Sequence, residues 1–425
     1  MKGKRRGLEA VKTLLILLLS ASAIYLLTMT PLVQDSGLLD LFQQDQQTGQ
    51  SDSSVTLAAA ARPARIAVSD GKSRYGLQYD QGAADELFVR MGPLLGEALA
   101  SSGVPEGISE SRWRDYLQGK GIYFDFVGDI PLVALSSWLQ SEQDCGLTAA
   151  ARRILLVEGQ DDSVLLCYQN AGDGRFYACQ TALLWSLHLA PEVNGMTGNG
   201  AWFAFEETDW SALLHPYTLI TEEPVLRICQ ASVPLTVGGN LSDLLEALEY
   251  TGRNHASVSG GELYLDGNDR LHVMDHGLVS YDAAQEGKYP VATLGGTVTL
   301  AEAIEAARKL AESTIGAQCG DAELYLLSAE KTEEGFCIRF GYRLNGTTLW
   351  LYDEGWAGEF YVSNGYINRF TLHFRSYTVT GEGAMLLPIE RAAVILPEMD
   401  RENGELILQY RDQGEPLVTP GWVAK

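Results

Sequence analysis

The chain has 425 residues, of which 46% are apolar and 20% are charged, so it can bury a large core. This composition excludes wholesale disorder and a fibrous repeat. The net charge is −24, from 31 Lys and Arg against 55 Asp and Glu. Because residues 1–12 are basic, the rest of the chain is more acidic still. A surface of that sign repels phosphate backbones, which excludes nucleic acid as a partner.

An uncharged apolar segment, Thr13–Val33, follows the basic N-terminus. At about 1.5 Å per residue, a helix of this length matches the hydrocarbon thickness of a bilayer. We predict a single transmembrane signal anchor at 13–33, with residues 1–12 in the cytoplasm and the C-terminal ectodomain outside the cell membrane. The alternative is a signal peptide cleaved after the A-x-A pattern at residues 21–23. Cleavage there would leave apolar residues 24–29 on the mature protein, so the anchor is favoured.

Small side chains within the anchor are the candidate contacts for a partner transmembrane helix, because small residues let helix backbones approach closely. These candidate residues are Ser20, Ala21, Ser22, Ala23 and Thr28. Residues 34–62 are rich in Gln, Ser, Asp and Ala and predict a flexible stalk.

A globular pattern begins at Pro63, and we assign residues 63–219 to an N-terminal ectodomain. Apolar residues at helical spacing predict a helix over Asp85–Ala100, and Ser109 is a candidate N-cap for a second helix. Apolar runs predict strands at 121–126, 154–158, 164–168 and 175–179. The turn signal Ala171–Gly174 joins the last two strands into a hairpin.

A helix followed by an antiparallel meander then occurs twice, in a central module at 220–293 and a C-terminal module at 294–425. The predicted helices are 241–248 and 300–311. Gly277 and Gly365 stand where a tight turn between paired strands needs a positive φ. The sequence therefore predicts an α+β ectodomain.

Several short blocks form a consistent order along the chain. They are Lys12 with Leu14 and 17–20, 63–66, Trp113 with Tyr116, 121–126, 130–131, 277–281, 339–346, 362–367 and 417–422. Together with the anchor, this order resembles the YycH regulatory protein family, and the C-terminal part resembles the related YycI proteins.

The resemblance implies a function through protein contacts. Members are membrane-anchored accessory regulators of the WalK–WalR two-component system of Gram-positive bacteria, which controls cell-wall homeostasis. The resemblance implies that the anchor contacts the transmembrane helices of a sensor histidine kinase. It also implies that the outer domains pair with a partner regulator of the YycI or YycH type. It implies no enzyme activity and no cofactor.

The chemistry-bearing residues do not form a recognisable catalytic motif. No H-E-x-x-H, G-x-S-x-G, S-x-x-K or Walker sequence occurs. His272 and His276 flank Asp275, but the pattern there is a strand entering a turn, where this spacing does not bring both imidazoles to one face. We therefore interpret this segment as a solvated hairpin end and predict no metal site.

Two of the six cysteines form a candidate disulfide. Cys167 and Cys179 are equidistant from Asp173, the centre of the predicted hairpin turn, so they are expected to face each other. The alternative is a pair of buried apolar thiols.

The sequence thus favours a non-enzymatic, membrane-anchored regulator of a sensor histidine kinase. The alternative is an extracytoplasmic ligand-binding or cell-wall-associated domain. A surface hydrolase is disfavoured, because no catalytic motif was found.

Overall fold

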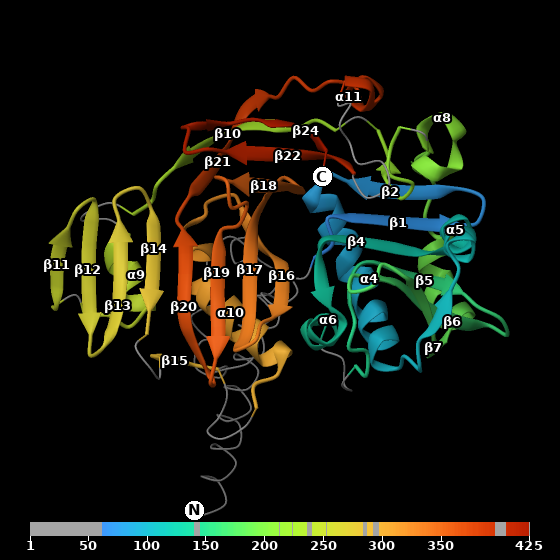
Figure 1. Ribbon diagram of the computed structural model, residues 1–425. Coiled ribbons are helices and arrows are strands. Elements are labelled where there is room, and N and C mark those ends of the chain that lie inside the picture. Colours follow the sequence, from blue (N-terminus) through green and yellow to red (C-terminus); the bar gives the residue numbers. More distant parts are fainter. Residues whose placement is uncertain are drawn as a thin grey trace, which may run out of the picture. The chain divides into compact units, whose positions relative to one another are not determined.

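The computed structural model describes residues 62–139, 145–211, 213–222, 224–235, 240–251, 253–283, 287–291, 297–395 and 405–424. These residues form a mixed α+β fold dominated by antiparallel sheets (Figure 1). The α+β class expected for the ectodomain is confirmed for this part of the chain. The predicted cytoplasmic segment, anchor and nearly all of the stalk lie outside the described residues.

The first sheet has seven strands, and all its neighbouring pairs are antiparallel. Their spatial order is β2 (Arg74–Gln78), β1 (Arg65–Asp70), β4 (Lys120–Pro131), β5 (Ala150–Glu158), β6 (Ser163–Asn170), β7 (Phe176–Leu184) and β3 (Glu106–Ile108). The strands predicted from apolar runs correspond to parts of β4, β5, β6 and β7. The predicted hairpin joins β6 to β7.

Helices cover both faces of this sheet. Helix α4 (Gln81–Ala100) packs on one face, and its apolar stripe shares a core with Ile66 and Phe124 of the sheet. Helix α5 (Glu110–Gln118) packs on the other face, where Trp113 stacks on Phe176. The predicted N-cap of α5 is confirmed, because the Ser109 hydroxyl accepts a hydrogen bond from the Arg112 N–H at 3.2 Å.

Helix α4 begins one turn earlier than its apolar pattern indicates. The carboxylate of Asp80 caps it by accepting from the Ala83 N–H at 3.1 Å. This cap lies before the first apolar position of the helical stripe, so hydrophobic spacing alone placed the start too late.

Strand β4 contains an irregular segment between Asp125 and Ile130, where its pairing with β5 shifts register. Val127 has φ +67°, a left-handed conformation that a β-branched residue rarely adopts. Its N–H donates to the Asp125 carboxylate at 2.9 Å, which holds the bulged backbone. At Gly128 a Cβ atom would lie 2.5 Å from the Leu326 carbonyl oxygen, so glycine allows the bulge to pack against the second sheet.

Short elements follow the first sheet and pack on both its faces. In chain order they are η2 (Trp185–Leu189), α7 (Ala190–Asn194), β8 (Trp202–Phe203), η3 (Ala204–Glu206), α8 (Thr208–Ser211) and β9 (Leu219–Ile220). Tyr217 lies edge-on to Trp113, so the part of this segment around β8 and β9 belongs to the same aromatic core as α5, whereas Leu189 and Val193 lie in the core on the α4 side.

The second sheet has twelve strands. Its main path is β11 (His255–Val258), β12 (Gly261–Asp266), β13 (Asp269–Met274), β14 (Leu278–Asp282), β20 (Tyr366–His373), β19 (Gly358–Ser363), β17 (Gly335–Leu344), β18 (Thr347–Leu351), β22 (Leu406–Asp412) and β24 (Pro420–Ala424). Off this path, β15 (Tyr289–Pro290) pairs with β20 and β16 (Glu323–Lys331) pairs with β17. All pairs are antiparallel except β18 with β22.

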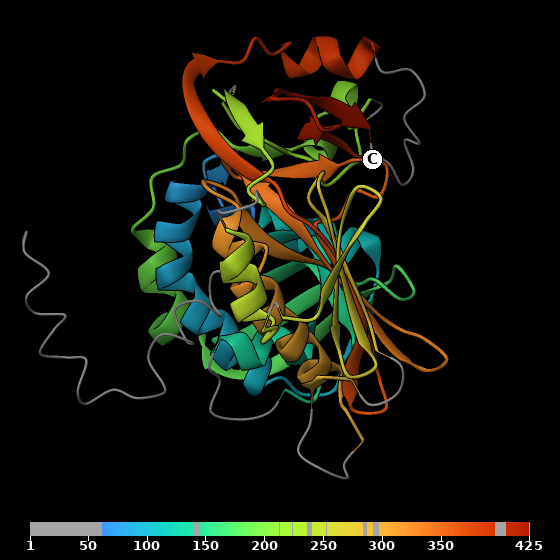
Figure 2. The same ribbon diagram turned by 90° about the vertical axis from the view of Figure 1, so that its left-hand side faces the viewer.

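Helices α9 (Leu241–Ala247) and α10 (Leu300–Ser313) lie on one face of the twelve-stranded sheet, behind the strands in Figure 1 and beside them in Figure 2. The start of α10 is set by a capping box. The Thr299 hydroxyl accepts from the Glu302 N–H, and the Glu302 carboxylate accepts from the Thr299 N–H at 2.8 Å. Both helices begin at the residues that the sequence pattern predicted.

The turns of this sheet use the expected glycines. Gly277 has φ +90° and Gly365 has φ +86°. Asn364 also has a positive φ, so residues 364–365 close the β19–β20 hairpin as an Asn-Gly turn.

A third, three-stranded sheet has the order β21 (Ser376–Gly383), β10 (Arg227–Ser232) and β23 (Leu417–Val418). The remaining short helices are α6 (Leu132–Trp138), η4 (Gly316–Gln318) and α11 (Ile389–Ile395). Helix α6 follows β4 directly and carries Leu135 and Trp138 into the buried core.

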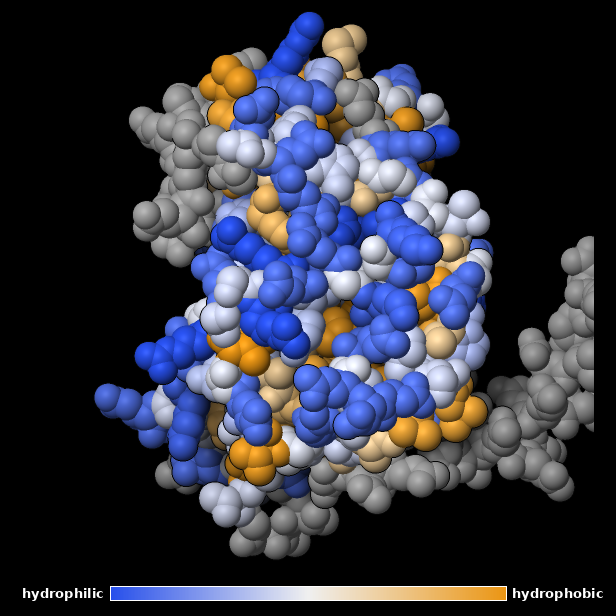
Figure 3. Space-filling model, turned by 90° about the vertical axis from the view of Figure 1, so that its right-hand side faces the viewer, coloured by the Kyte–Doolittle hydropathy of each residue, from blue (hydrophilic) through white to orange (hydrophobic). Residues whose placement is uncertain are grey.

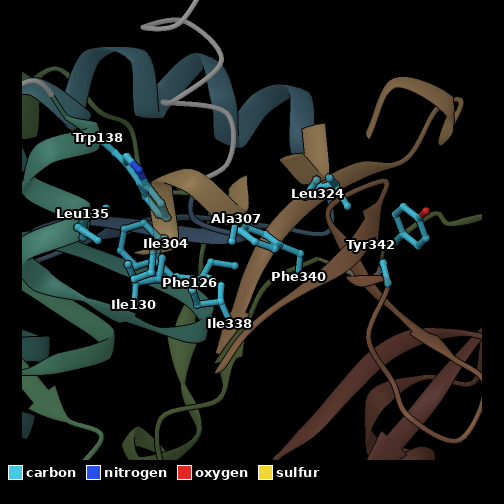
Figure 4. Close-up of a cluster of buried hydrophobic side chains, with 14 of the residues drawn as sticks. Phe126, Ile130, Leu135, Trp138, Ile304, Ala307, Leu324, Ile338, Phe340 and Tyr342 are labelled. Atoms are coloured by element: carbon cyan, nitrogen blue, oxygen red, sulfur yellow. The ribbon is translucent and has the colours of Figure 1, made fainter. Parts of the chain in front are cut away.

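The two large sheets share one hydrophobic core. Figure 4 shows Phe126 and Ile130 of β4 meeting Ile304 of α10, with Ile338 and Phe340 of β17 alongside. All five side chains are buried. A polar contact adds to this junction, since the Trp138 indole N–H donates to the Glu305 carboxylate at 3.4 Å. Helix α10 therefore joins the first sheet to the second.

The first predicted domain corresponds to one sheet, whereas the other two predicted modules share a single sheet. The segment 63–219 contains every strand of the first sheet. The central and C-terminal modules do not form separate sheets. Strand β14 of the central module pairs with β20 of the C-terminal module over Leu278–Asp282. Their two meanders are thus halves of one sheet.

Candidate functional site

The predicted transmembrane contacts, Ser20, Ala21, Ser22, Ala23 and Thr28, lie outside the described residues. Within the described ranges, no helix combines the length and apolar character needed to cross a bilayer.

The prediction that Cys167 and Cys179 lie opposite each other is wrong, because the register of β6 against β7 differs by one residue from the expected one. Cys167 lies opposite Ala178, and Cys179 lies opposite Leu166. Because side chains alternate between the faces of a sheet, this shift sends the two thiols to opposite faces. Cys167 packs in the α5-side core and Cys179 in the α4-side core, and both are free. Burial raises the pKa of Cys179 to about 11, as expected of a packed thiol.

The histidines of the His272–His276 segment are separated by the strand end, as the sequence indicated. His272 lies in β13 opposite Leu263 and Ser280, whereas His276 lies in the following turn. Among the described residues, no group of three or more His, Cys, Asp or Glu side chains is arranged to hold a metal ion.

A buried charge cluster is the most distinctive polar feature of the described fold. It comprises Arg65 of β1, Asp125 of β4, Arg152 and Arg153 of β5, and Glu405, which directly precedes β22. The Arg65 guanidinium donates to Asp125 at 3.0 Å and to Glu405 at 2.7 Å. Arg152 forms a fork on Asp125, with Nε–Oδ1 at 2.7 Å and Nη2–Oδ2 at 3.0 Å. Arg153 Nη2 donates to Glu405 Oε2 at 3.1 Å.

Both carboxylates of the charge cluster are held in the ionised form. Burial alone would raise the pKa of Asp125, but the charges of Arg152 and Arg65 outweigh it and hold that pKa well below its usual range. Burial also opposes ionisation of Glu405, and Arg152, Arg65 and Arg153 together lower its pKa to about 2. Glu405 thereby attaches the beginning of β22, in the second sheet, to two strands of the first sheet, β1 and β5.

The sequence patterns did not predict the charge cluster, although the sequence contains one signal for it. Arg152 and Arg153 are consecutive charged residues inside an otherwise apolar strand. Simple alternation would place them on opposite faces. A register shift between Ala151 and Ile154 in the β5–β6 pairing lets both side chains reach Glu405. A bulge of this kind cannot be located from the strand pattern alone.

One face of the twelve-stranded sheet is not covered by α9 or α10 (Figure 2). Tyr264 and Leu271 point toward the helices and are buried. Leu263 and Leu265 alternate to the opposite face, where Leu265 is 42% exposed. We name this the open sheet face. By contrast, the side of the molecule shown in Figure 3 is mostly hydrophilic, with apolar residues in small separate patches.

A polar cavity of about 620 Å³ lies beside the N-terminus of α4. Tyr79 and Asn345, which both have a positive φ, line it from different parts of the chain. Amide, carboxylate and guanidinium groups also line it, beside apolar residues such as Leu77 and Val225; the polar ones are Gln78, Asp80, Gln81, Asn199, Glu222 and Arg227. Such a wall offers both hydrogen-bond donors and acceptors to a polar ligand.

These features place the protein in the α+β class, with two large, mainly antiparallel sheets that share a core. Searches against protein-family models and against curated proteins found no match. Among solved structures, the chain is similar to YycH from Bacillus subtilis, with a TM-score of 0.53 and 12% sequence identity. The similarity covers 89% of this chain and 96% of that one. The likeness shows a YycH-like fold.

Proposed function

We propose that the protein is a non-enzymatic, membrane-anchored regulator that acts outside the cytoplasm on a sensor histidine kinase of a two-component system. The observation that carries the proposal is the YycH-like fold, which extends over nearly the full length of both chains. The short sequence blocks that resemble the YycH and YycI families point the same way. The apolar segment 13–33 supports the anchor and the topology.

In this proposal the protein acts through two kinds of contact. The anchor packs against the kinase's transmembrane helices through its small residues around Ala21. The ectodomain pairs with a partner regulator of the YycI or YycH type. The open sheet face offers a surface for that pairing, because no described helix covers it and it exposes apolar residues such as Leu265.

The experiment is crosslinking of the full-length chain, in native membranes, followed by identification of any sensor histidine kinase in the adducts. We expect a specific kinase adduct and, in the same membranes, co-purification of a partner regulator. Leu265→Asp on the open sheet face should weaken regulator pairing several-fold. The matched control is Val89→Asp on α4, which is 73% exposed on a different element and should leave pairing unchanged. Absence of any kinase adduct would contradict the proposal.

A second candidate function is binding of an extracytoplasmic polar ligand or cell-wall fragment. The polar cavity beside α4 favours it, since its lining presents amides and both signs of charge. Binding of the full chain to purified peptidoglycan, abolished by Asn345→Trp, would support this function. Equal binding by that variant would exclude the cavity.

A further inference from the structure

Strand β11 forms one end of the twelve-stranded sheet. It pairs with β12 on one side and lies at the left-hand border of the sheet in Figure 1, so no described strand pairs with its other edge. The Leu265 N–H donates to the Asn254 carbonyl at 2.9 Å, which fixes the phase of the pairing with β12. Successive residues of an antiparallel strand direct their backbone groups to alternate sides. Those of Ala256 therefore face β12, and those of Ser257 face the outer side, which we name the β11 edge.

The β11 edge lacks the features that protect most edge strands from pairing. Natural edge strands are blocked by charged residues, proline or bulges. Strand β11 contains no Lys, Arg, Asp, Glu or Pro, and it pairs with β12 without a register shift. All four of its residues are exposed, including the apolar Val258 at 37%. The β11 edge is therefore regular and accessible, and it can accept another strand.

The β11 edge also suits a second copy of this chain. A net charge of −24 makes two copies repel each other over most of their surface. Residues 250–261, which include β11, contain no Asp or Glu and one Arg, so two copies bring no acidic side chains together there. A two-fold axis through Ala256 pairs the strand with itself in the antiparallel sense. The small Ala256 side chains then lie opposite each other, and Arg253 lies opposite Ser259 in the turn, away from the second Arg253.

We propose that the β11 edge is a dimer interface, at which two copies of this chain join their sheets through antiparallel pairing of β11 with β11. The backbone N–H and C=O of Ser257 supply hydrogen bonds to the second copy, as in other cases of strand addition. The contact is isologous, so its two-fold axis limits the assembly to two copies. The pairing is independent of the proposed kinase regulation, because it does not use the anchor and leaves the open sheet face uncovered.

The test is disulfide trapping in the full-length chain in native membranes. The Cα atoms of opposed, non-hydrogen-bonded residues in an antiparallel pair lie about 4.5 Å apart, within the range of a disulfide. Ala256→Cys should therefore link two copies under a mild thiol oxidant, measured as dimer on a non-reducing gel. The six native cysteines are buried and do not compete. The matched control is Ala424→Cys, exposed on β24 at the other end of the sheet, which should give several-fold less dimer.

A second substitution in the Ala256→Cys chain shows whether backbone pairing forms the dimer. Ser257→Pro removes the N–H that faces the β11 edge and leaves the bonds to β12 in place, so dimer should fall to the control level. Ser257→Thr keeps this N–H and should retain the crosslink. Tryptophan fluorescence checks the folding of each variant, and the cysteine comparison decides the proposal by itself if the proline variant does not fold.

Three results would overturn the proposal. The first is dimer formation by Ala256→Cys no greater than by Ala424→Cys. The second is a dimer that persists in a folded Ser257→Pro variant. The third is a crosslink from Ala256→Cys to a different protein in place of a second copy, which would assign the β11 edge to another partner.

Discussion

The Arg65 guanidinium donates to the Glu405 carboxylate at 2.7 Å, although 340 residues separate them in the chain. Arg65 lies on the first strand of the first sheet, and Glu405 directly precedes β22 of the second. Both side chains are buried. Their contact, together with the apolar junction at α10, makes the two sheets depend on each other for stability.

Glu405→Gln should strongly destabilise the fold. It leaves the buried guanidinium groups of Arg65 and Arg153, and the partly buried one of Arg152, with a single carboxylate, and loss of one partner from a buried ion pair costs about 3–5 kcal/mol. The control is Glu192→Gln, whose partner Arg90 is 52% exposed, for which we expect a change of about 1 kcal/mol or less. Urea denaturation of both variants, followed by tryptophan fluorescence, measures the difference. Equal midpoints would show that the charge cluster is not stabilising.

The stability should fall as the pH drops from about 6.5 toward 4, through His215. Burial, followed by the nearby charge of Arg153, lowers the pKa of His215 to about 4. In the unfolded chain the pKa is about 6.5. Between these values the unfolded state binds more protons, so acid favours unfolding, by up to about 3 kcal/mol.

The measurement for His215 is the free energy of unfolding at several pH values above 4.5. There the lowered pKa of Glu405 contributes little, because its stabilisation is lost only as pH falls from its unfolded value toward about 2. His215→Gln should flatten the profile between pH 6.5 and 4.5. An unchanged slope in this variant would assign the acid sensitivity to another group.

Ile304→Ala should destabilise both sheets at once. Ile304 is fully buried on α10 between β4 and β17, and truncation of such a side chain costs about 2–5 kcal/mol. We expect hydrogen exchange to accelerate in strands of both sheets. Lys309→Ala, on an exposed position of the same helix, controls for helix propensity. Acceleration confined to the second sheet would show that α10 does not link the two.

All six cysteines should be free thiols. Each is buried, and Cys167 and Cys179 lie on opposite faces of the first sheet. Thiol titration without reductant should give little reaction in the native protein and six thiols per chain in denaturant. Four thiols in denaturant would instead indicate one disulfide.

Ala21→Leu should weaken coupling to the kinase while keeping the chain in the membrane. Leucine is favourable in the bilayer core, but its bulk prevents close helix approach and should cost about 1 kcal/mol of association. Leu17→Ile is the matched control within the same segment. Crosslinking of the full-length variants to the kinase compares them. Equal adducts would mean that the segment only tethers the ectodomain.

N-terminal sequencing of the membrane-bound protein tests the anchor itself. We expect the mature chain to retain residues 13–33, because their apolar length suits a membrane span. A mature N-terminus at Ile24 would instead establish a cleaved signal peptide and remove the helix-contact mechanism.

Local chemistry in the sequence was sufficient to predict many of the elements. Ser109 could be identified as an N-cap because capping depends on neighbouring residues alone. Gly277 and Gly365 could be placed in turns for a similar reason, since a tight turn with a positive φ favours glycine. Periodicity likewise located the helix starting at Leu300 and the hairpin between β6 and β7.

Contacts between distant residues were decided only by the tertiary structure. A shift of one residue in the β6–β7 register separated Cys167 from Cys179, and the strand pattern carries no information at that precision. The bulge that brings Arg152 and Arg153 to Glu405, and the pairing of β14 with β20, depend on how the two sheets pack. The sequence therefore determined the α+β class and the local turns and caps. The register, the shared sheet and the buried charge cluster required the folded chain, because each depends on residues tens to hundreds of positions apart.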